Sequence, residues 1–365
     1  MTKTIGYAAK HSVSALRPMF IDRREPGASD VVIDVMFCGV CHSDVHQVKN
    51  EWKNTVYPCM PGHEIVGRVT AVGASVKKFG AGDLVGVGCM VDSCRECRSC
   101  KEGLEQYCER GFLATYNGNA RNPSEENLTF GGYSESIVVR EDFVLRIPSG
   151  MSLASAAPLM CAGLTTFSPM RYWKVGPGTS LAVVGLGGLG HMAVKLARAL
   201  GADVTVISTS PDKKEAARIL GAKKLIVSTE KKEMEEAESS FDFILSTIPQ
   251  PHDVNIYMPL LKRDGILTIV GCIAPLTKPL DISGMIMDRR VLATSLIGGV
   301  AETQEVLDFA AKNGISADVK VIPIDEVNDA FKTVDEGEVP YRFVIDMASI
   351  KGKTEDDSLM AKVGL

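Results

Sequence analysis

The stretch TSLAVVGLGGLGHMAVKLARALGADVTVIS, residues 179–208, decides the fold of this 365-residue chain. Its apolar run Leu181–Val184 is typical of a strand that is buried on both faces of a parallel sheet. After a glycine-rich turn, the pattern predicts a helix over 191–200, which Gly201 would end, and a second buried strand over 204–207. The stretch therefore predicts a βαβ unit and, with it, a parallel sheet.

The turn between the first strand and the helix has the glycine spacing GxGxxG. Such a turn lets the backbone approach a pyrophosphate, and the following helix presents free N–H groups and the positive end of its dipole. A glycine-rich turn that binds no nucleotide is the alternative, but the position between a strand and a helix favours a dinucleotide site. The predicted cofactor-binding turn consists of Gly185, Leu186, Gly187, Gly188, Leu189 and Gly190.

The end of the second strand indicates which dinucleotide binds. An NAD site normally has Asp or Glu about 20 residues after the glycines, where the carboxylate binds the ribose 2′-hydroxyl. Hydroxyl and lysine side chains stand here instead, namely Ser208, Thr209, Ser210 and Lys213. Ser210 would cap a helix that begins at Pro211, and the group as a whole favours the 2′-phosphate of NADP(H). Asp212 weakens this inference, and the alternative is that Ser210 is only a helix cap and Lys213 lies in solvent.

Further apolar segments complete the organisation of the chain. Four more strands, which would make a complete six-stranded Rossmann sheet, are predicted over 225–227, 241–248, 265–271 and 291–299. Short strands and glycine turns dominate residues 31–144 and are typical of an irregular β-barrel. A helix over 302–313 and a strand over 341–346 follow the sheet.

These patterns predict an α/β chain with two domains. We expect a first domain over 1–160 that includes a cysteine-rich lobe at 89–112, a nucleotide-binding domain over 161–298, and a return segment of the first domain over 299–365.

Composition and charge exclude several classes of protein. A net charge of -5 without a basic run gives no electrostatic case for nucleic acid. The start of the chain, MTKTIGYAAKHSV, lacks the apolar core of a signal peptide, and no apolar stretch reaches the about 18 residues that a membrane span needs. We therefore expect a cytoplasmic protein. Because the cytosol is reducing, closely spaced cysteines are candidates for metal binding or catalysis rather than for disulfides.

The stretch SCRECRSCKEGLEQYC, residues 93–108, contains four of the ten cysteines: Cys94, Cys97, Cys100 and Cys108. The side chains between them are too polar for a core, and CxxC spacing lets the sulfurs turn toward one tetrahedral zinc ion. A redox CxxC pair or incidental thiols are the alternatives, but a dithiol switch needs only two cysteines. Four protein ligands leave no open position, so we predict a structural zinc site.

A second set of metal-binding side chains is dispersed along the chain. It comes from the segments CGVCHSDVH, PGHE and MCAG, which contain Cys38, Cys41, His63, Glu64 and Cys161. A catalytic zinc takes three protein ligands and leaves one position for water or a carbonyl oxygen. Each residue alone is a weak signal, because a lone cysteine is most often a small buried hydrophobe. Together with a dinucleotide site, the set is a much stronger one.

Several motifs together resemble the zinc-containing medium-chain alcohol dehydrogenases. The segments CHSDVH, GHE at 62–64, the four-cysteine lobe and GLGGLG fall in that family's order and spacing. Within the family, the segments HQVKNEW, YPCMPGHEIVGRV and YRFVID are most similar to the cinnamyl alcohol dehydrogenase branch, especially to bacterial broad-range NADPH-dependent aldehyde reductases. The resemblance covers nearly the whole chain and implies a GroES-like irregular β-barrel catalytic domain joined to a doubly wound Rossmann domain.

The resemblance also implies a role for each dispersed ligand. Cys41, His63 and Cys161 match the ligands of the catalytic zinc, and Glu64 matches a carboxylate that can approach the metal. Cys38 falls outside the family's ligand set. Because the four-cysteine lobe matches the family's structural site, two zinc ions per chain are implied.

The segment CHSDVH further resembles the family's proton relay. Ser43 matches the hydroxyl that hydrogen-bonds the substrate oxygen, His46 matches the outer base, and Asp44 matches the carboxylate that orients the zinc-binding histidine. The candidate pocket residues are Trp52, Leu113 and Ile297. Leu113 stands where lignin-type members carry a tryptophan, which argues against a strict preference for bulky cinnamyl substrates.

We therefore predict a zinc-dependent, NADP(H)-linked enzyme that interconverts primary alcohols and aldehydes of aromatic, cinnamyl or aliphatic type. Three alternatives are an NAD-dependent alcohol or polyol dehydrogenase of the same fold, a zinc-free quinone-type reductase, and a nucleotide-binding protein that has lost catalysis. Ser208 in place of an acid argues against the first. The presence of all three zinc ligands argues against the second.

The apolar segment VLATSLIGG, residues 291–299, resembles the edge strand through which dimers of the family join their sheets. We therefore expect a homodimer. The alternative is that the segment is an ordinary internal strand.

Overall fold

The computed structural model describes residues 2–271, 273–337 and 342–355, and these form two compact units. We call the first the mixed-sheet unit, and it falls within Met1–Cys161, Gly299–Ala311 and Ser316–Leu365. The second, the parallel-sheet unit, falls within Ala162–Gly298 and Lys312–Ile315. The chain thus leaves the mixed-sheet unit after Cys161 and later returns to it.

The parallel-sheet unit is built on six strands that pair in the order β12-β11-β10-β13-β14-β15. They are β10 (Ser180–Val184), β11 (Asp203–Ser208), β12 (Lys224–Val227), β13 (Phe241–Ser246), β14 (Leu261–Ile269) and β15 (Val291–Thr294). All neighbouring strands are parallel. The order reverses between β10 and β13, which is where ligands bind in sheets of this kind. The prediction of a complete Rossmann sheet is confirmed.

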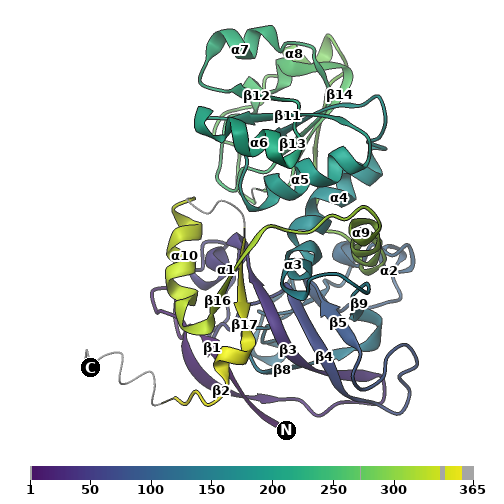
Figure 1. Cartoon of the computed structure of the whole chain (residues 1–365), viewed down its shortest axis with the longest axis vertical. Helices are drawn as coiled ribbons and strands as arrows, with labels where there is room; N and C mark the ends of the chain where they lie inside the picture. Colours follow the sequence, from purple (N-terminus) through teal and green to yellow (C-terminus); the bar gives the residue numbers. More distant parts are fainter. Residues whose placement is uncertain (1, 272, 338–341, 356–365) are drawn as a thin grey trace. The chain divides into compact units, whose positions relative to one another are not determined.

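Helices connect these strands, as parallel pairing requires. They are α5 (Gly188–Ala199), α6 (Lys214–Leu220), α7 (Lys231–Glu236) and α8 (Ser283–Ile286), and a further helix, α4 (Ala162–Tyr172), precedes β10. Figure 1 shows α5 and α6 against the strands, and α5 contacts β11 while α6 contacts β12. Val183, Ile207 and Ile244 are completely buried in the strands, as expected for a sheet covered on both faces.

Some element bounds differ from the predicted ones. The helix predicted over 191–200 begins earlier, at Gly188, because the amide of His191 already donates to the carbonyl of Gly187 at 3.0 Å. The strand predicted over 291–299 ends at Thr294, since its partner strand β14 ends at the paired residue.

The mixed-sheet unit contains a seven-stranded sheet in the order β16-β17-β3-β4-β5-β9, in which β8 also pairs with β3. Its strands are β3 (Asp30–Val40), β4 (Ile65–Val72), β5 (Leu84–Val87), β8 (Ser136–Arg140), β9 (Leu145–Arg146), β16 (Val319–Pro323) and β17 (Arg342–Asp346). Two further sheets pair β1 (Thr2–Ala8) with β2 (Arg17–Arg23), and β6 (Met90–Asp92) with β7 (Leu113–Ala114). The β16–β17 pair is parallel, and all the other strand pairs named here, including β17 with β3, are antiparallel. One large, mostly antiparallel sheet with two small two-stranded sheets agrees with the expected irregular β architecture.

The helices of the mixed-sheet unit are α1 (His42–Val48), α2 (Arg98–Lys101), α3 (Leu153–Ala156), α9 (Val300–Lys312) and α10 (Val327–Asp335). The helix predicted over 302–313 is α9, which begins slightly earlier. The strand predicted over 341–346 is β17, although Tyr341 lies outside the described residues. Because β17 pairs with β3, the return segment adds a strand to the sheet that the first part of the chain builds.

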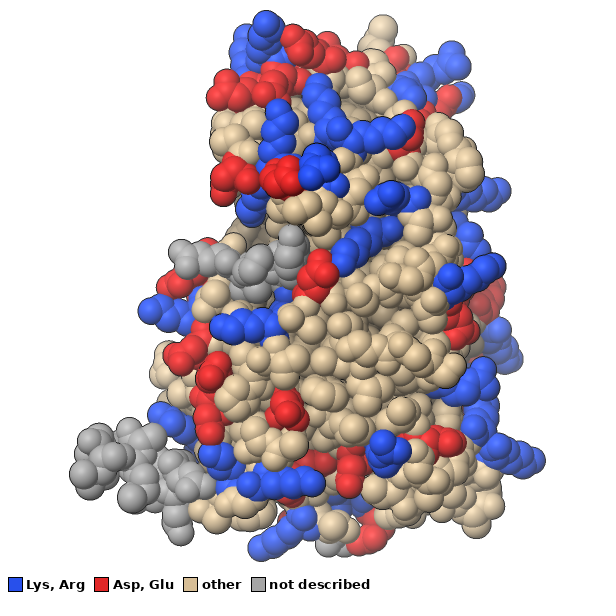
Figure 2. All heavy atoms as spheres, viewed as in Figure 1, with Lys and Arg blue, Asp and Glu red and all other residues tan. Residues whose placement is uncertain are grey.

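The surface carries charges of both signs. Figure 2 shows Lys and Arg side chains interspersed with Asp and Glu side chains on one face, without a broad field of either sign. Among the helices of the described residues, none has the length and the apolar character needed to cross a membrane. The nine cysteines that the structure describes all carry free thiols.

Candidate functional site

The dispersed metal-binding side chains come together in the mixed-sheet unit. Cys41, His63, Glu64 and Cys161 each offer one donor atom, and these atoms lie within 4.8 Å of one another. The Sγ atoms of Cys41 and Cys161 are 3.9 Å apart. This separation is close to the roughly 3.8 Å expected between two thiolates on a tetrahedral zinc with Zn–S bonds of about 2.3 Å. Cys38 is not part of the group, and burial raises the pKa of its thiol well above the usual range.

Asp44, at the start of α1, connects the segment that carries Cys41 with the segment that carries His63. Cys41 is the residue before α1, and its backbone N–H donates to Oδ2 of Asp44 in the first turn at 2.9 Å. The other oxygen, Oδ1, accepts a hydrogen bond from Nδ1 of His63 at 3.0 Å. Asp44 therefore has the geometry that its predicted orienting role requires: it fixes the histidine ring and leaves Nε2 available for a metal.

A glycine places His63, the histidine of this candidate metal-binding group. Gly62 precedes His63 and has a φ of 107°, a conformation that glycine adopts without strain. A Cβ at Gly62 would also lie 2.8 Å from Sγ of Cys38. Cys161 stands at the end of the 3-10 helix Ala157–Met160, just before α4 begins.

The carboxylate of Glu64 is an independent sign that a cation belongs at this group. Both of its oxygens are buried, and neither has a hydrogen-bond partner among the described residues, which is costly unless a charge compensates. Its ion pair is with Arg342, whose Nη2 lies 3.1 Å from Oε1. Burial raises the pKa of Glu64 to about 7, against the opposing charge of Arg342. Two thiols, an imidazole and a carboxylate are donors that zinc takes in proteins, so the residues present fit zinc.

The position of Glu64 depends on a glycine opposite it. A Cβ at Gly39 would lie 2.0 Å from Oε2 of Glu64, so any other residue at this position would displace the carboxylate. Gly39 lies on β3 and pairs with Val344 of β17, the strand that also carries Arg342. The guanidinium of Arg342 donates in addition to the carbonyl of Val40 at 3.2 Å. The return segment therefore supplies a charge partner of the site.

The electrostatics of the group favour a thiolate. The hydrogen bond from Cys161 lowers the pKa of Cys41 well below that of a free thiol, and Arg342 adds to this against the effect of burial. Burial by itself lowers the pKa of Arg342, but the negative charges of Glu64, Cys41 and Cys161 outweigh it and raise that pKa. Because zinc binds the thiolate, the site suits a cation before one is bound.

The other residues of the predicted relay lie on α1. Ser43 is half-buried in the first turn, and His46 follows three residues later. Nδ1 of His46 pairs with Oε2 of Glu51. The ring of His46 also lies 4.4 Å from that of His42 and 5.5 Å from that of Trp52. Glu51 thus orients His46 much as Asp44 orients His63.

Three side chains around this site were missed by the sequence reasoning: Glu51, Tyr133 and Arg342. Glu51 follows His46 closely in the sequence, and an acid soon after a candidate base was a signal that could have found it. Tyr133, whose hydroxyl donates to Oδ2 of Asp44 at 3.2 Å, and Arg342 come from distant segments that carry no such signal.

The cysteine-rich lobe forms a second metal-binding group. The Sγ atoms of Cys94, Cys97, Cys100 and Cys108 lie within 4.8 Å of one another, with Cys97 and Cys100 3.5 Å apart. The backbone N–H groups of Glu96 and Cys97 lower the pKa of Cys94 to about 6. Four sulfur donors at this spacing fit a tetrahedral zinc and leave no open position, as a structural site requires.

The glycine-rich turn begins where β10 ends. Gly185 has a φ of 90°, and a Cβ at Gly190 would lie 2.2 Å from its carbonyl oxygen, so tight packing explains both glycines. At Gly187, by contrast, a Cβ would meet no protein atom within 4 Å. The approach of a phosphate to the backbone explains this glycine, which also stands at the N-terminus of α5 where free N–H groups attract an anion. The turn therefore fits a dinucleotide.

The side chains predicted to bind the 2′-phosphate lie just beyond β11. Ser208 is buried, its Oγ accepts the backbone N–H of Ser210 at 3.1 Å, and Thr209 is exposed. The predicted helix cap is wrong in part: Ser210 precedes a short 3-10 turn, Pro211–Lys213, and α6 begins only at Lys214. The reason is that the last amide of the turn donates to the backbone carbonyl of Ser210 at 3.3 Å, not to its hydroxyl.

The cofactor residues and the candidate pocket residues divide between the units. The glycine turn and the residues after β11 belong to the parallel-sheet unit, whereas the metal and relay residues belong to the mixed-sheet unit. Trp52 and Leu113 belong to the mixed-sheet unit, and Ile297 belongs to the other, with a φ of 36° that is rare for a β-branched residue. Their role in substrate binding stays a prediction.

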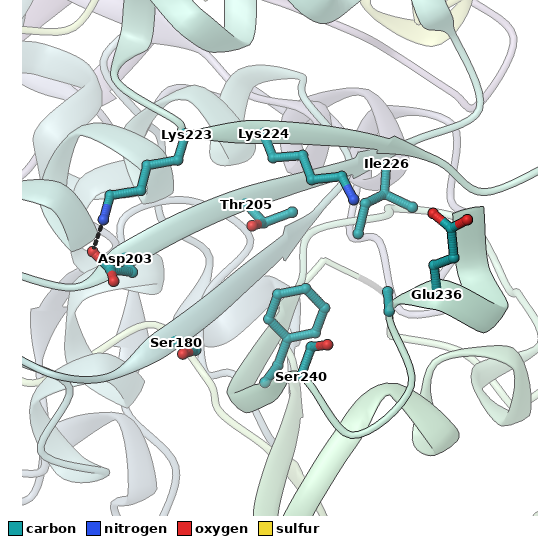
Figure 3. Close-up of a pocket in the computed structure, with 10 residues that line it drawn as sticks. Ser180, Asp203, Thr205, Lys223, Lys224, Ile226, Glu236 and Ser240 are labelled. Atoms are coloured by element: carbon teal, nitrogen blue, oxygen red, sulfur yellow. Dashed lines mark hydrogen bonds and ion pairs between the residues drawn. The ribbon is translucent and has the colours of Figure 1, made fainter.

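A separate pocket of about 240 Å³ lies in the parallel-sheet unit (Figure 3). Its lining includes Ser180 and Asp203, which begin β10 and β11, and Lys223, which pairs with Asp203. The pocket therefore lies toward the amino-terminal ends of the strands, whereas the glycine turn follows their carboxyl ends. Since ligands of open parallel sheets bind at the carboxyl ends, this pocket is not part of the cofactor site.

Comparison with known proteins agrees with this geometry. Residues 27–149 match the alcohol dehydrogenase GroES-like domain, and residues 188–312 match the zinc-binding dehydrogenase domain. The chain is 53% identical to the aldehyde reductase YahK of Escherichia coli K12, over 94% of this chain and 97% of that protein. It is 48% identical to the NADP-dependent alcohol dehydrogenase C 1 of Mycolicibacterium smegmatis, over 96% of this chain and all (100%) of that protein.

The fold is similar to that of a solved relative as well. A cinnamyl alcohol dehydrogenase from Sorghum bicolor superposes with a TM-score of 0.92 at 45% identity, over 97% of this chain and 100% of that one. Because it covers 97% of this chain, the likeness extends over both units. The chain therefore belongs to the zinc-dependent medium-chain alcohol dehydrogenase family, in its cinnamyl alcohol dehydrogenase-like branch.

Proposed function

We propose that this protein is an NADP(H)-dependent zinc alcohol dehydrogenase that interconverts aldehydes and primary alcohols. The observation that carries the proposal is the buried group of two thiols, an imidazole and a carboxylate, whose donor atoms fit one zinc ion. The chain also contains a glycine turn with space for a phosphate at Gly187. The names of the aldehyde reductase and of the NADP-dependent dehydrogenase among its relatives support the same activity.

Zinc, when bound, supplies Lewis-acid polarisation of the substrate carbonyl, and NADPH supplies the hydride. Cys41, His63 and Cys161 would hold the metal, since two thiolates and an imidazole are ligands that zinc takes in catalytic sites. Asp44 accepts the Nδ1 proton of His63 and so keeps Nε2 directed at the metal. Arg342 balances the negative charge of the two thiolates and Glu64, which keeps the buried site stable.

The relay residues complete the reaction with a proton. Ser43 donates to the oxygen on which negative charge develops, and His46 restores that proton. Glu51 pairs with Nδ1 of His46, which fixes the orientation of the ring. Alcohol oxidation runs along the same path in reverse.

The experiment that tests the proposal follows absorbance at 340 nm with NADPH and with NADH, against benzaldehyde, cinnamaldehyde and medium-chain aliphatic aldehydes. We expect rapid oxidation of NADPH and much slower oxidation of NADH, and the ranking of the aldehydes then defines the substrate class. Equal rates with NADH would favour the NAD-dependent alternative. No turnover of any aldehyde or alcohol by protein that contains two zinc ions would favour a non-catalytic role.

Replacement of His46 by alanine tests the relay. We expect kcat to fall by about a hundredfold, because general acid catalysis contributes at least this much. The dissociation constant of NADPH, measured by fluorescence, should not change, and added imidazole should restore part of the rate. His11→Ala, which removes an exposed histidine in the same unit, is the matched control and should leave kcat unchanged. A kcat within twofold of wild type would remove His46 from the relay.

We also propose that the protein is a homodimer. β15 is an outer strand of the six-stranded sheet, and an unpaired strand edge is a ready surface for a second chain. Close to it in the sequence, Ile286 and Met287 are 71% and 83% exposed, an arrangement that a partner would cover. Sedimentation should give the mass of two chains, and Met287→Asp should shift it toward one, since a buried charge opposes association. A single-chain mass for the wild type would contradict the proposal.

The cytosol is the proposed location. Six of the described thiols belong to the two metal-binding groups, and a reducing compartment preserves such thiols.

A further inference from the structure

Residues 131–133, which we call the backing segment, lie far from the ligands in the sequence but support the backbone next to the metal-binding histidine, His63. Residues 131–133 run beside residues 60–62, and three backbone N–H groups of the former donate to the carbonyls of the latter at 2.8, 2.9 and 3.1 Å. His63 follows residues 60–62 directly. The segment 131–133 therefore fixes the backbone that presents this ligand.

The two segments approach too closely for side chains between them. A Cβ at Gly131 would lie 2.4 Å from the carbonyl oxygen of Pro61. The ring of Tyr133 packs on Gly62, where a Cβ would lie 2.7 Å from Cδ1 of the ring. Glycine on both sides thus brings Tyr133 against the turn that leads into the ligand.

The hydroxyl of Tyr133 donates a hydrogen bond to Asp44, the carboxylate that orients His63. Tyr133 is completely buried, and its hydroxyl donates to Oδ2 of Asp44 at 3.2 Å. The same oxygen accepts the N–H of Cys41 at 2.9 Å, while Oδ1 accepts Nδ1 of His63 at 3.0 Å and the N–H of Gly62 at 3.3 Å. Of these donors, Tyr133 alone lies outside the two ligand segments.

A buried arginine clamps the backing segment. Arg23, on β2, donates through Nη1 to the carbonyl of Phe130 at 2.6 Å, and through Nη2 to the carbonyl of Gly131 at 2.9 Å and Oγ of Ser134 at 2.7 Å. These acceptors lie on both sides of Tyr133 in the sequence. Burying a guanidinium costs free energy unless it is hydrogen-bonded. The hydrogen bonds of Arg23 named here all go to residues 130–134, so they stabilise the position of this segment.

We propose that Tyr133 is a positioning residue for the catalytic metal, acting through Asp44 on His63. The inference rests on the proposed zinc site at Cys41, His63 and Cys161. Without the hydroxyl, Oδ2 of Asp44 loses one of its donors, so the carboxylate turns more freely and the imidazole with it. A ligand that is held less firmly releases its metal faster.

Tyr133→Phe tests this in the zinc-loaded enzyme. The variant keeps the ring and its packing and removes only the hydroxyl. Zinc release to an excess of the chromogenic chelator 4-(2-pyridylazo)resorcinol should show two phases, and Cys161→Ala identifies the phase of the catalytic ion because it retains only the ion of the lobe. We expect the catalytic phase to be about tenfold faster in Tyr133→Phe. Removing a hydrogen-bond partner of a metal ligand typically lowers metal affinity by about 10- to 100-fold, and Tyr133 acts one step further from the metal. Release from the lobe should not change.

Tyr7→Phe is the matched control. Tyr7 is a buried tyrosine of the same unit whose hydroxyl donates to the carboxylate of Asp325 at 2.6 Å, and Asp325 belongs to neither metal-binding group. It should lower the thermal midpoint as much as Tyr133→Phe does but leave both phases of zinc release unchanged. With cobalt in the catalytic site, only Tyr133→Phe should alter the visible ligand-field spectrum.

The outcomes separate this inference from the proposed function. Two zinc ions in the wild type, with unchanged release and an unchanged cobalt spectrum in Tyr133→Phe, would overturn the role of Tyr133 alone. A wild type that binds only the zinc of the lobe would overturn the proposed function and this inference together. Faster release from both sites would show a general loss of stability and would equally overturn a positioning role.

Discussion

Replacement of Cys161 by alanine is expected to lower kcat/KM for aldehyde reduction by on the order of a thousandfold, since Lewis-acid stabilisation of the developing negative charge supplies several kcal/mol. The buried thiol is one of the three proposed ligands, and its Sγ lies 3.9 Å from that of Cys41. Without it, the remaining thiolate, imidazole and carboxylate hold zinc far less tightly. Elemental analysis should find one zinc ion per chain in place of two.

The control for this variant is Cys59→Ala, which removes another buried thiol of the same unit that belongs to neither metal-binding group. It should retain two zinc ions and most of the activity, although its stability falls by the cost of a small cavity, about 1 kcal/mol. A Cys161→Ala enzyme that kept both zinc ions and more than a tenth of the activity would show that Cys161 is not a ligand.

Replacement of Ser208 by aspartate is expected to change the cofactor preference toward NADH, with the ratio of kcat/KM for NADPH to that for NADH falling by about a hundredfold. A carboxylate at the end of β11 would repel the 2′-phosphate, and two charges near a protein surface interact by about 1 to 4 kcal/mol. It would also accept the ribose 2′-hydroxyl of NADH, as acids at this position do. The ratio should be measured from initial rates with each cofactor at saturating aldehyde.

The fold should tolerate this change. Oγ of Ser208 accepts the N–H of Ser210 at 3.1 Å, and a carboxylate oxygen can accept the same N–H. Ser208→Ala separates charge from hydroxyl: it should weaken NADPH binding modestly without any gain for NADH. If aspartate lowered the rates with both cofactors equally, the 2′-phosphate would not bind beside Ser208.

Elements that depend on neighbours in the sequence were predicted well. The apolar strand, the glycine turn and the helix of 179–208 follow from local periodicity. The largest departure from the prediction is that α5 begins at Gly188 rather than at 191, and the other bounds differ by at most one residue. The cap at Ser210 was predicted less well, because the choice between a hydroxyl and a backbone carbonyl as acceptor depends on a single turn of chain.

Some residues of the candidate sites could be predicted from spacing in the sequence, and others could not. CxxC spacing alone brings the sulfurs of the lobe within reach of one ion, so its four donors could be named from the chain. Cys41, His63 and Cys161 could be grouped only through the family resemblance, because more than a hundred positions separate the first from the last. Glu51 was within reach of a local argument, whereas Arg342 and Tyr133 were not.

Periodicity and spacing were enough to predict the βαβ unit, the glycine turn, the hydroxyl residues at the end of β11 and the cysteine lobe, because they act between residues that are close along the chain. The groups that surround the proposed catalytic ligands could be identified only once the chain was folded. Pairing of β17 with β3 brings Arg342 to Glu64, and the contact of residues 131–133 with residues 60–62 brings Tyr133 to Asp44. Such partners are fixed by strand register and by close backbone approach, which depend on the whole fold and leave no pattern in the local sequence.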